Sequence, residues 1–445
     1  MSAWLVGCLV VGCNRAPSVE NTAGSQGESE EAAAIELAVH DGGTLASGAP
    51  PVAAASDWPW WRGPRGDGKS TDQRNLPTTW TTTENVLWKA PVAGRGHSSP
   101  SIVGERIFLT TADEQAEKQL ILCYARQSGK PLWSTVAHEG GFMRRHEKNS
   151  EASATPACAG ERVYAVFING GDLKVTATDL DGNIVWQESA GVFDSEWGYG
   201  SSILLYESLV IVLGDSLSKS FIAALDRETG KLVWSTPRKS TGNHGSWATP
   251  IVGRLAGKDQ LLVTGTWQVS SYNPTTGELI WFCEGPAECT ACTVAISDKL
   301  VFASGGYPEK EILAIRADGS GDVTDSHVVW RSKRGVTYVP SPVYHEGHLY
   351  SVNDGGMATC IEAASGKQLW QERLGGAFSA SPVLAGGHFY AMNESGRTFV
   401  FKARPKFEAV AENDLGDGGF ASPVICGGRI FIRTDDYLYC IGADS

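Results

Sequence analysis

The chain has 445 residues and a formal net charge of -13, with 52 glycines and 15 tryptophans. This acidic balance argues against a surface for nucleic acid or anionic lipid, because both need an excess of Lys and Arg to displace counterions. The length allows two or three ordinary domains or one repeat fold, since closed all-β folds run longer as single units.

The chain starts with a short apolar run that ends in Val10-Val11-Gly12-Cys13. This run is too short for a membrane-spanning helix, which needs about 20 residues. Small residues before a cysteine are typical of a bacterial lipobox, in which that cysteine is cleaved to the N-terminus and acylated. A poorer match ends at Cys8, and no Lys or Arg precedes the run. We expect residues 1–13 to be a lipoprotein-type signal segment with lipidation at Cys13. That would place the protein on the periplasmic side of a bacterial membrane, as an outer-membrane lipoprotein.

Residues 14–56 are rich in Ala, Glu, Ser and Gly and contain no aromatic residue. Such a segment cannot bury enough apolar surface to offset the entropy of ordering it. We expect a disordered acidic tether here, followed by a single folded unit over residues 57–445.

Two phrases recur through the folded unit. Gly-x-x-x-Trp occurs at Gly129/Trp133, Gly182/Trp186, Gly230/Trp234, Gly277/Trp281 and Gly366/Trp370. The second phrase is a small hydroxyl-bearing residue, an apolar pair, a turn and another β-rich run. Aligning its eight copies on the turn superposes Ser99, Thr155, Ser201, Thr249, Cys292, Ser341, Ser381 and Ser422. These span 323 residues in seven steps, and a mean near 46 is the period of a four-stranded propeller blade.

The distribution of residue size fits an all-β, eight-bladed β-propeller with four-stranded antiparallel blades. The residue before each superposed position is compact, as at Ala154, Gly200 and Ala421, which suits inner strands that converge on a channel. Tryptophan falls on the outer strands, where there is volume to fill. We expect structural blade tryptophans at Trp88, Trp133, Trp186, Trp234, Trp281, Trp330 and Trp370.

The two ends of the repeat region complement each other. The C-terminal run supplies three strands of the eighth blade, whereas the strand around Trp88 precedes the first blade and has no blade of its own. Pairing the two would protect both sheet edges, so we expect the N-terminal strand to close the ring by joining the C-terminal blade. Blade seven departs from the pattern, with KFEAVAE where a Trp-bearing strand is expected.

The phrase ALDRETGKLVW resembles the tryptophan-bearing repeat of the pyrroloquinoline-quinone-like (PQQ-like) propellers, and the resemblance covers residues 57–442. This family includes quinoprotein dehydrogenases and BamB, a lipoprotein of outer-membrane protein assembly. The likeness to BamB implies a non-enzymatic scaffold with a protein partner in the cell envelope. It also implies a monomeric propeller whose only membrane contact is a lipid anchor.

The same resemblance leaves open a quinoprotein oxidoreductase that would bind PQQ with Ca²⁺. Such enzymes typically carry adjacent cysteines, acidic and amide Ca²⁺ ligands and a catalytic Asp. The sequence has no Cys-Cys pair, and Cys289 and Cys292 are the closest two. His345 and His348 lack the i, i+4 spacing of a helical zinc pair. We therefore predict no catalytic residue, no metal and no cofactor, and the pairing of the eight cysteines beyond Cys8 and Cys13 stays open.

The segments that enter the inner strands share one face of the predicted ring, because all inner strands run the same way. They carry Arg, His and aromatic side chains, which dominate binding hot spots, and their cations favour an anionic or carbonyl-bearing ligand or an acidic protein segment. We predict a ligand- or partner-binding rim at Arg95, His97, Arg144, Arg145, His146, Trp197, Tyr199, His244, Trp247, Arg334 and Tyr338, beside Phe378 and Phe420. One alternative is a plug of the channel without a binding role. Another is a sugar- or peptide-binding module with Trp197, Tyr199 and Trp247 as its stacking platform.

Overall fold

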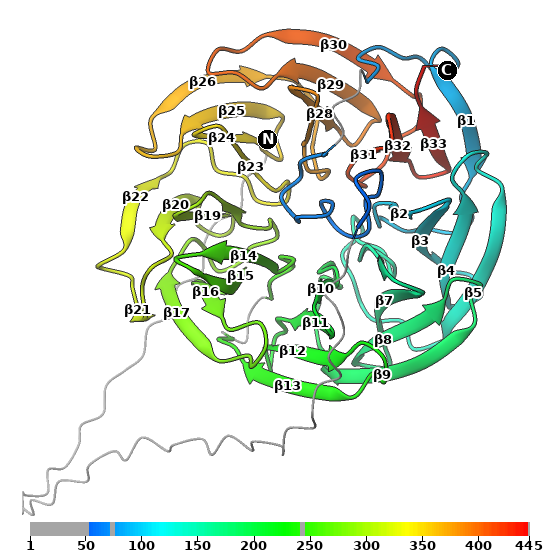
Figure 1. Cartoon of the computed structure of the whole chain (residues 1–445), viewed down its shortest axis with the longest axis horizontal. Helices are drawn as coiled ribbons and strands as arrows, with labels where there is room; N and C mark the ends of the chain where they lie inside the picture. Colours follow the sequence, from blue (N-terminus) through cyan, green and yellow to red (C-terminus); the bar gives the residue numbers. More distant parts are fainter. Residues whose placement is uncertain (1–52, 72–75, 241–244, 444–445) are drawn as a thin grey trace, which may run out of the picture. The chain divides into compact units, whose positions relative to one another are not determined.

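The computed structural model describes residues 53–71, 76–240 and 245–443. These residues form 33 strands and no α-helix, arranged as eight sheets around a common centre (Figure 1). The predicted all-β, eight-bladed propeller is thereby confirmed. No helix among these residues has the length and apolarity of a membrane span. The predicted signal segment with Cys13, and the tether up to residue 52, lie outside the described residues.

The first four blades follow one another along the chain. Blade 1 consists of β2 (Ser101–Val103), β3 (Arg106–Asp113), β4 (Lys118–Ala125) and β5 (Pro131–Glu139). Blade 2 consists of β6 (Ala157–Ala159), β7 (Arg162–Asn169), β8 (Asp172–Asp179) and β9 (Ile184–Val192). Blade 3 consists of β10 (Leu204–Tyr206), β11 (Leu209–Gly214), β12 (Phe221–Asp226) and β13 (Leu232–Pro237). Blade 4 consists of β14 (Ile251–Leu255), β15 (Lys258–Gly265), β16 (Gln268–Tyr272) and β17 (Leu279–Glu284), and β21 (Gly321–Asp322) pairs in parallel with its edge.

The last four blades continue the order. Blade 5 consists of β18 (Ala295–Ile296), β19 (Leu300–Gly305), β20 (Glu311–Arg316) and β22 (Val328–Ser332). Blade 6 consists of β23 (Val343–His345), β24 (His348–Val352), β25 (Met357–Glu362) and β26 (Gln368–Arg373). Blade 7 consists of β27 (Val383–Ala385), β28 (His388–Met392), β29 (Arg397–Lys402) and β30 (Ala409–Asp414). Blade 8 consists of β31 (Val424–Cys426), β32 (Arg429–Arg433), β33 (Tyr437–Ile441) and β1 (Val86–Pro91).

Burial changes from the centre of each blade to its edge. A middle strand such as β11 is buried at every residue, because neighbouring blades cover both of its faces. The outer strand β9 is buried only at Trp186 and Ala190. The repeated tryptophans therefore supply much of the apolar contact that an outer strand makes with its neighbours.

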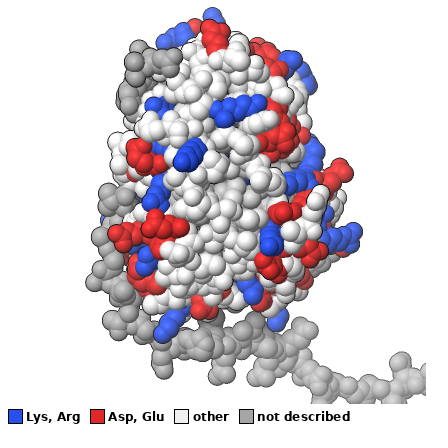
Figure 2. Space-filling view, turned by 90° about the vertical axis from the view of Figure 1, so that its right-hand side faces the viewer, with Lys and Arg blue, Asp and Glu red and all other residues white. Residues whose placement is uncertain are grey.

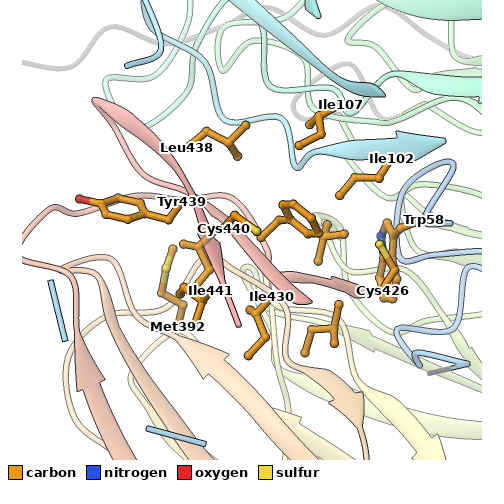
Figure 3. Close-up of a cluster of buried hydrophobic side chains, with 14 of the residues drawn as sticks. Trp58, Ile102, Ile107, Met392, Cys426, Ile430, Leu438, Tyr439, Cys440 and Ile441 are labelled. Carbon is orange, nitrogen blue, oxygen red and sulfur yellow. The ribbon is translucent and has the colours of Figure 1, made fainter. Parts of the chain in front are cut away.

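Strand β1 closes the ring from the N-terminal side. It pairs antiparallel with β33, with Val86 opposite Ile441 and Pro91 opposite Tyr437. This is the arrangement that the unpaired Trp88 strand predicts. Buried side chains from both ends of the chain join one hydrophobic cluster, which includes Ile107 of β3 and Leu438 of β33 (Figure 3).

The Gly-x-x-x-Trp phrase joins neighbouring blades. The φ angle of Gly182 is +89°, and a Cβ added there would lie 2.7 Å from the indole of Trp133 in the preceding blade. The same relation holds for the pairs Gly129/Trp88, Gly230/Trp186, Gly277/Trp234 and Gly366/Trp330, each at 2.5–2.7 Å. The indole of Trp133 also donates a 2.8 Å hydrogen bond to the carbonyl of Leu180 in the same turn. Glycine is therefore required both for its backbone conformation and to admit the indole.

The outer strands of three blades lack the glycine contact. In blade 6, Trp370 Nε1 still donates to the carbonyl of Arg404 in the next blade at 2.9 Å. In blade 4, the fully buried Trp281 donates to Gln260 Oε1 at 2.8 Å, within its own sheet. In blade 7, Ala411 lies opposite Val400, at the register position that tryptophan holds in the other blades. Trp80 of the N-terminal segment packs into the same cluster and stacks on Tyr390 at 6.3 Å between ring centroids. The irregular strand predicted in blade 7 is thus covered from the other end of the chain.

Candidate functional site

A ring of hydrogen bonds between hydroxyl and amide groups surrounds the central channel. In seven of the eight blades, the backbone N–H just before the inner strand donates to a Ser or Thr hydroxyl of the next blade, as from Thr155 to Ser202 Oγ at 2.9 Å and from Ser422 to Ser99 Oγ at 3.0 Å. The ring residues are Ser99, Thr155, Ser202, Thr249, Thr293, Ser341, Ser381 and Ser422. The sequence alignment was wrong by one residue in two blades, where it placed Ser201 and Cys292 in the ring in place of Ser202 and Thr293. The two residues of each pair are adjacent and similar in size, so size does not distinguish them.

The segment of residues 57–70 closes the channel beneath this ring. Trp58 exchanges backbone hydrogen bonds with Ile102 of blade 1, both at 2.8 Å. Trp61 Nε1 donates to Thr293 Oγ1 of blade 5 at 3.1 Å, and Ser70 Oγ donates to the carbonyl of Ile425 in blade 8 at 2.7 Å. Figure 1 shows this segment at the centre of the ring. The channel is therefore a cup with a floor.

The cup encloses a cavity of about 570 Å³. Every one of the eight connections that enter an inner strand contributes to its wall. The lining residues include Trp61, His97, His146, Lys148, Asn149, Trp197, Ser202, Trp247, Thr249, Cys289, Tyr307, Tyr338, Ser379, Ser381, Phe420 and Ser422. The structure thus brings together His97, His146, Trp197, Trp247 and Tyr338 of the predicted rim, with Phe420.

Ring contacts fix several of these aromatic side chains. His97 lies against Phe420 with 4.5 Å between ring centroids, and His146 lies against Trp197 at 5.7 Å. Trp247 Nε1 donates to the carbonyl of Gly198 at 2.8 Å. These contacts hold flat apolar faces in the wall of the cup.

The wall of the cup carries little uncompensated charge. Burial, and the charges of Arg433, Arg95 and Arg145, lower the pKa of His97 to about 3, so His97 is neutral at pH 7. Lys148 Nζ contacts both carboxylate oxygens of Glu394, at 3.1 and 2.9 Å. None of the described residues that line the cavity is Asp or Glu.

Two buried guanidinium groups lie behind the lining. Burial lowers the pKa of Arg433 to about 10, and its Nη1 donates to Ser98 O, Ser98 Oγ and Thr110 O at 3.2, 2.7 and 2.8 Å. Burial likewise lowers the pKa of Arg62 to about 10, and Arg62 Nη2 donates to the carbonyl of Pro342 at 2.7 Å. Both groups stay charged at pH 7. Arg62 joins the floor segment to blade 6, whereas Arg433 joins blade 8 to Ser98 and Thr110 at blade 1.

The remaining predicted rim residues do not line the cavity. Tyr199 is buried and donates through its hydroxyl to the carbonyl of Leu213 at 3.0 Å, so the expected platform of Trp197, Tyr199 and Trp247 loses its middle member. Phe378 is buried in the core between blades 6 and 7. Arg334 is exposed and follows the outer strand β22. His244 lies outside the described residues.

Three predicted arginines pair with carboxylates around the mouth. Arg95 lies 3.6 Å from Glu114, and Arg145 pairs with Glu114 and lies 3.6 Å from Glu151. Arg144 pairs with Glu196 at 3.4 Å while its side chain stays 77% exposed. Arg95 and Arg145 therefore hold the loops in place, whereas Arg144 presents its charge to solvent.

Trp61 and Tyr307 line the cup but were missed in the sequence. Tyr307 lies in the turn between β19 and β20. Because the four strands of a blade alternate in direction, the turn between its second and third strands emerges on the same face as the entry to its first. That alternation was the signal available for Tyr307. Trp61 precedes the first blade, and the repeat pattern does not predict where this part of the chain lies.

All eight cysteines among the described residues are buried. Burial raises the pKa of Cys289, in the cavity wall, and of Cys292 to about 12. No group of three or more His, Cys, Asp or Glu side chains suited to a metal ion occurs among the residues that the structure describes.

Comparisons with solved structures show the same fold at low sequence identity. BamB from Moraxella catarrhalis is 13% identical with a TM-score of 0.56, over 80% of this chain and 99% of that one. Quinohemoprotein alcohol dehydrogenase from Comamonas testosteroni is 12% identical with a TM-score of 0.61, over 88% and 82%. A europium-containing methanol dehydrogenase is 11% identical with a TM-score of 0.62, over 88% and 98%. At such identities the likeness shows the fold alone.

Sequence comparison assigns the family. No curated protein matches the chain. The family described as "Outer membrane protein assembly factor BamB" matches residues 69–195, 218–320 and 319–405, which together make up more than half of the chain. The chain therefore belongs to the outer membrane protein assembly factor BamB family of PQQ-like propellers.

Proposed function

We propose that the protein is a non-enzymatic scaffold of the bacterial cell envelope, which binds a protein partner in outer-membrane protein assembly through the loops around the mouth of the cup. Membership of the BamB family supports the class of partner. Rigid scaffolds that hold loops on one face are a common way to build a binding surface.

The observation that carries the non-enzymatic role is the direction of the pKa shifts in the cup. General acid–base catalysis is most efficient when the pKa of the catalytic group lies near the working pH. Here burial lowers the pKa of His97 to about 3 and raises that of Cys289 to about 12. Burial also raises the pKa of Tyr338. These groups keep one protonation state throughout the physiological range, which suits binding better than proton transfer.

The lining of the cup does not fit PQQ with Ca²⁺. An acidic quinone needs cationic partners and its calcium ion needs carboxylate oxygens. Among the described lining residues, Lys148 is the only Lys or Arg, and its charge is compensated by Glu394 at 2.9 Å. The second candidate function, a quinoprotein oxidoreductase, is supported by the fold shared with the two dehydrogenases.

The exposed residues around the mouth are of the types that dominate protein interfaces. Tyr307 is 51% exposed and Trp197 is 37% exposed, and Arg144, which is 77% exposed, pairs with Glu196, the residue before Trp197 in the chain. On the side of the ring seen in Figure 2, basic and acidic side chains are interspersed without a patch of one sign. The mouth is thus the better candidate for a specific interface.

Site-specific photo-crosslinking tests this proposal in cells. A photoreactive amino acid at Tyr307 or Arg144 should capture an envelope protein, whereas the same group at Leu279 on the outer strand β17, which is 48% exposed, should not. Equal capture from Leu279, or none from either mouth position, would count against the mouth as the interface. Titration of the purified protein with PQQ and Ca²⁺ tests the alternative enzymatic role. Saturable dye reduction in this assay would refute the non-enzymatic scaffold.

The membrane anchor has its own test. We propose that Cys13 carries the lipid, so Cys13→Ser should move the protein from the membrane fraction to the soluble periplasmic fraction and abolish labelling by a fatty-acid probe. A Cys8→Ser variant is the matched control and should stay labelled. Labelling that survives in Cys13→Ser would exclude this anchor.

A further inference from the structure

The cavity itself has the dimensions of a small-ligand site. Its volume of about 570 Å³ falls within the range of about 300–1,000 Å³ that such sites occupy. Trp61 and its segment form the floor, so a ligand would enter and leave through the mouth. The scaffold role needs only the exposed loops, and the interior of the cup is a separate feature that it does not explain.

Aromatic faces line the wall on several sides of the cup. Trp197 and Trp247 come from the connections before blades 3 and 4, whereas Tyr307 and Tyr338 come from blades 5 and 6. His97 and Phe420 form a further pair at the junction of blades 8 and 1. A ligand in the cup would therefore meet flat apolar rings from opposing directions, which suits a ligand that itself has flat apolar faces.

Polar groups lie between these rings. Four hydroxyls of the hydrogen-bonded ring line the cavity, at Ser202, Thr249, Ser381 and Ser422. Each accepts an N–H from the neighbouring blade at 2.9 Å. A hydroxyl that accepts one hydrogen bond still has its O–H to donate. A purely apolar ligand would remove water from these hydroxyls without replacing its hydrogen bonds, which is unfavourable.

The distribution of charge selects against ions. A cationic ligand would find no Asp or Glu among the described lining residues. An anionic ligand would have to compete with Glu394 for Lys148, whose Nζ it already contacts at 2.9 Å. Neither Arg62 nor Arg433 is among the lining residues, and both donate to backbone carbonyls instead. The cup therefore favours a neutral molecule with apolar ring faces and many oxygen acceptors.

We propose that the cup binds a short neutral oligosaccharide. The C–H faces of its sugar rings stack on Trp197, Trp247 and Tyr307, and its oxygens accept hydrogen bonds from the hydroxyls of the ring. Asn149 Nδ2 donates to the carbonyl of Trp197 at 2.8 Å and so helps to hold this stacking residue in place. Trp197 and Tyr307 at the mouth belong to both proposals, but sugar binding is measured on the purified protein without a partner, so either proposal can fail while the other holds.

Binding of defined sugars tests the inference. The full-length protein is titrated with maltotriose, cellotriose and tri-N-acetylchitotriose, followed by calorimetry and by tryptophan fluorescence. At least one of these neutral sugars should bind saturably with a stoichiometry of one. Saturation-transfer NMR on the unmodified protein should show magnetisation passing from aromatic protons to the sugar C–H protons.

Matched variants locate the site. Trp197→Ala and Tyr307→Ala should each weaken binding about tenfold, which corresponds to about 1.4 kcal/mol, with an unchanged urea midpoint. Leu279→Ala, at an exposed outer-strand position, should bind as the unmodified protein does. The proposal is overturned if none of the three sugars binds, if both mouth variants bind them unchanged, or if only the acidic trigalacturonate binds.

Discussion

The contact between each repeated glycine and the indole of the preceding blade makes a quantitative prediction. In Gly182→Ala, the added Cβ would lie 2.7 Å from Trp133 Cδ2 and 2.9 Å from Thr135 Oγ1, at a φ of +89°. Gly160 in the same blade provides the matched control, because its φ is +61° and an added Cβ would meet nothing within 4 Å. The two variants share the conformational strain and differ in the clash.

The expected free energies of unfolding follow from these two terms. A Cβ in the left-handed region costs roughly 1–2 kcal/mol, which is all that Gly160→Ala should lose. Overpacking a well-packed site costs a further 1–3 kcal/mol or so, so Gly182→Ala should lose about 2–5 kcal/mol in total. The excess of Gly182→Ala over Gly160→Ala measures the contact between blades.

Urea unfolding followed by circular dichroism measures both losses. A third variant, Trp133→Leu, removes the indole, and in its background Gly182→Ala should cost no more than Gly160→Ala. If Gly160→Ala and Gly182→Ala are equally destabilised in the unmodified protein, the indole is not what requires glycine. A full loss that persists in the Trp133→Leu background would refute the reasoning as well.

Three further predictions rest on other parts of the fold. Arg238 and Asp215 form a buried pair at 2.7 Å, so Arg238→Ala should lower the free energy of unfolding by about 3–5 kcal/mol. Arg397→Ala, at an exposed pair, is the control and should lower it by under about 1 kcal/mol. Similar urea midpoints for the two variants would contradict this prediction. The folded pKa of His97, about 3, lies below its ordinary value of 6.5, so the unfolded chain binds more protons and stability should fall as pH drops from about 6.5 toward 3. In His97→Phe, the free energy of unfolding should depend less on pH between about 6.5 and 3. If the pH dependence of this variant equals that of the unmodified protein, the His97 imidazole is solvated in the folded state. Deletion of residues 57–92 removes the floor and β1 and should give aggregated or molten protein by size exclusion and circular dichroism; a folded monomer would contradict the closure.

The architecture was accessible from the sequence because it is repeated. Eight copies of one phrase set the number of blades, and the unmatched Trp88 strand indicated how the ring closes. The registers of Ser202 and Thr293 were missed because neighbouring small residues, Ser201 and Cys292, fit the size pattern equally well. Only a hydrogen bond with the adjacent blade distinguishes them: Ser202 accepts from Thr155 N, and Thr293 N donates to Ser341. Each contact joins residues about one blade apart in the chain.

The site was predicted less well than the fold, for a physical reason. Residue type and chain position place a loop on one face of a propeller, but they do not say which way a side chain turns. Tyr199 lies only two residues from Trp197, yet it points into the core and bonds to Leu213. Arg145 pairs with Glu114, while the adjacent Arg144 projects into solvent. Those choices depend on the local packing of each loop, which does not repeat from blade to blade.

Closure of the ring and formation of the cup depend on one continuous stretch of chain. Residues 57–70 form the floor and β1 completes blade 8. Because both belong to the same N-terminal stretch, separation of β1 from β33 should make it easier for Trp61 to leave the cavity. A ligand that binds only the closed form must therefore stabilise closure by mass action, and at a free concentration of 100 times its Kd the gain is about 2.7 kcal/mol. A sugar that binds in the cup should raise the urea midpoint of the unmodified protein. At the same sugar concentration, the urea midpoint of Trp197→Ala should rise much less. Because a sugar bound anywhere on the folded protein would raise the midpoint, the comparison with Trp197→Ala locates the site. An equal rise in Trp197→Ala would show that the sugar binds away from the cup.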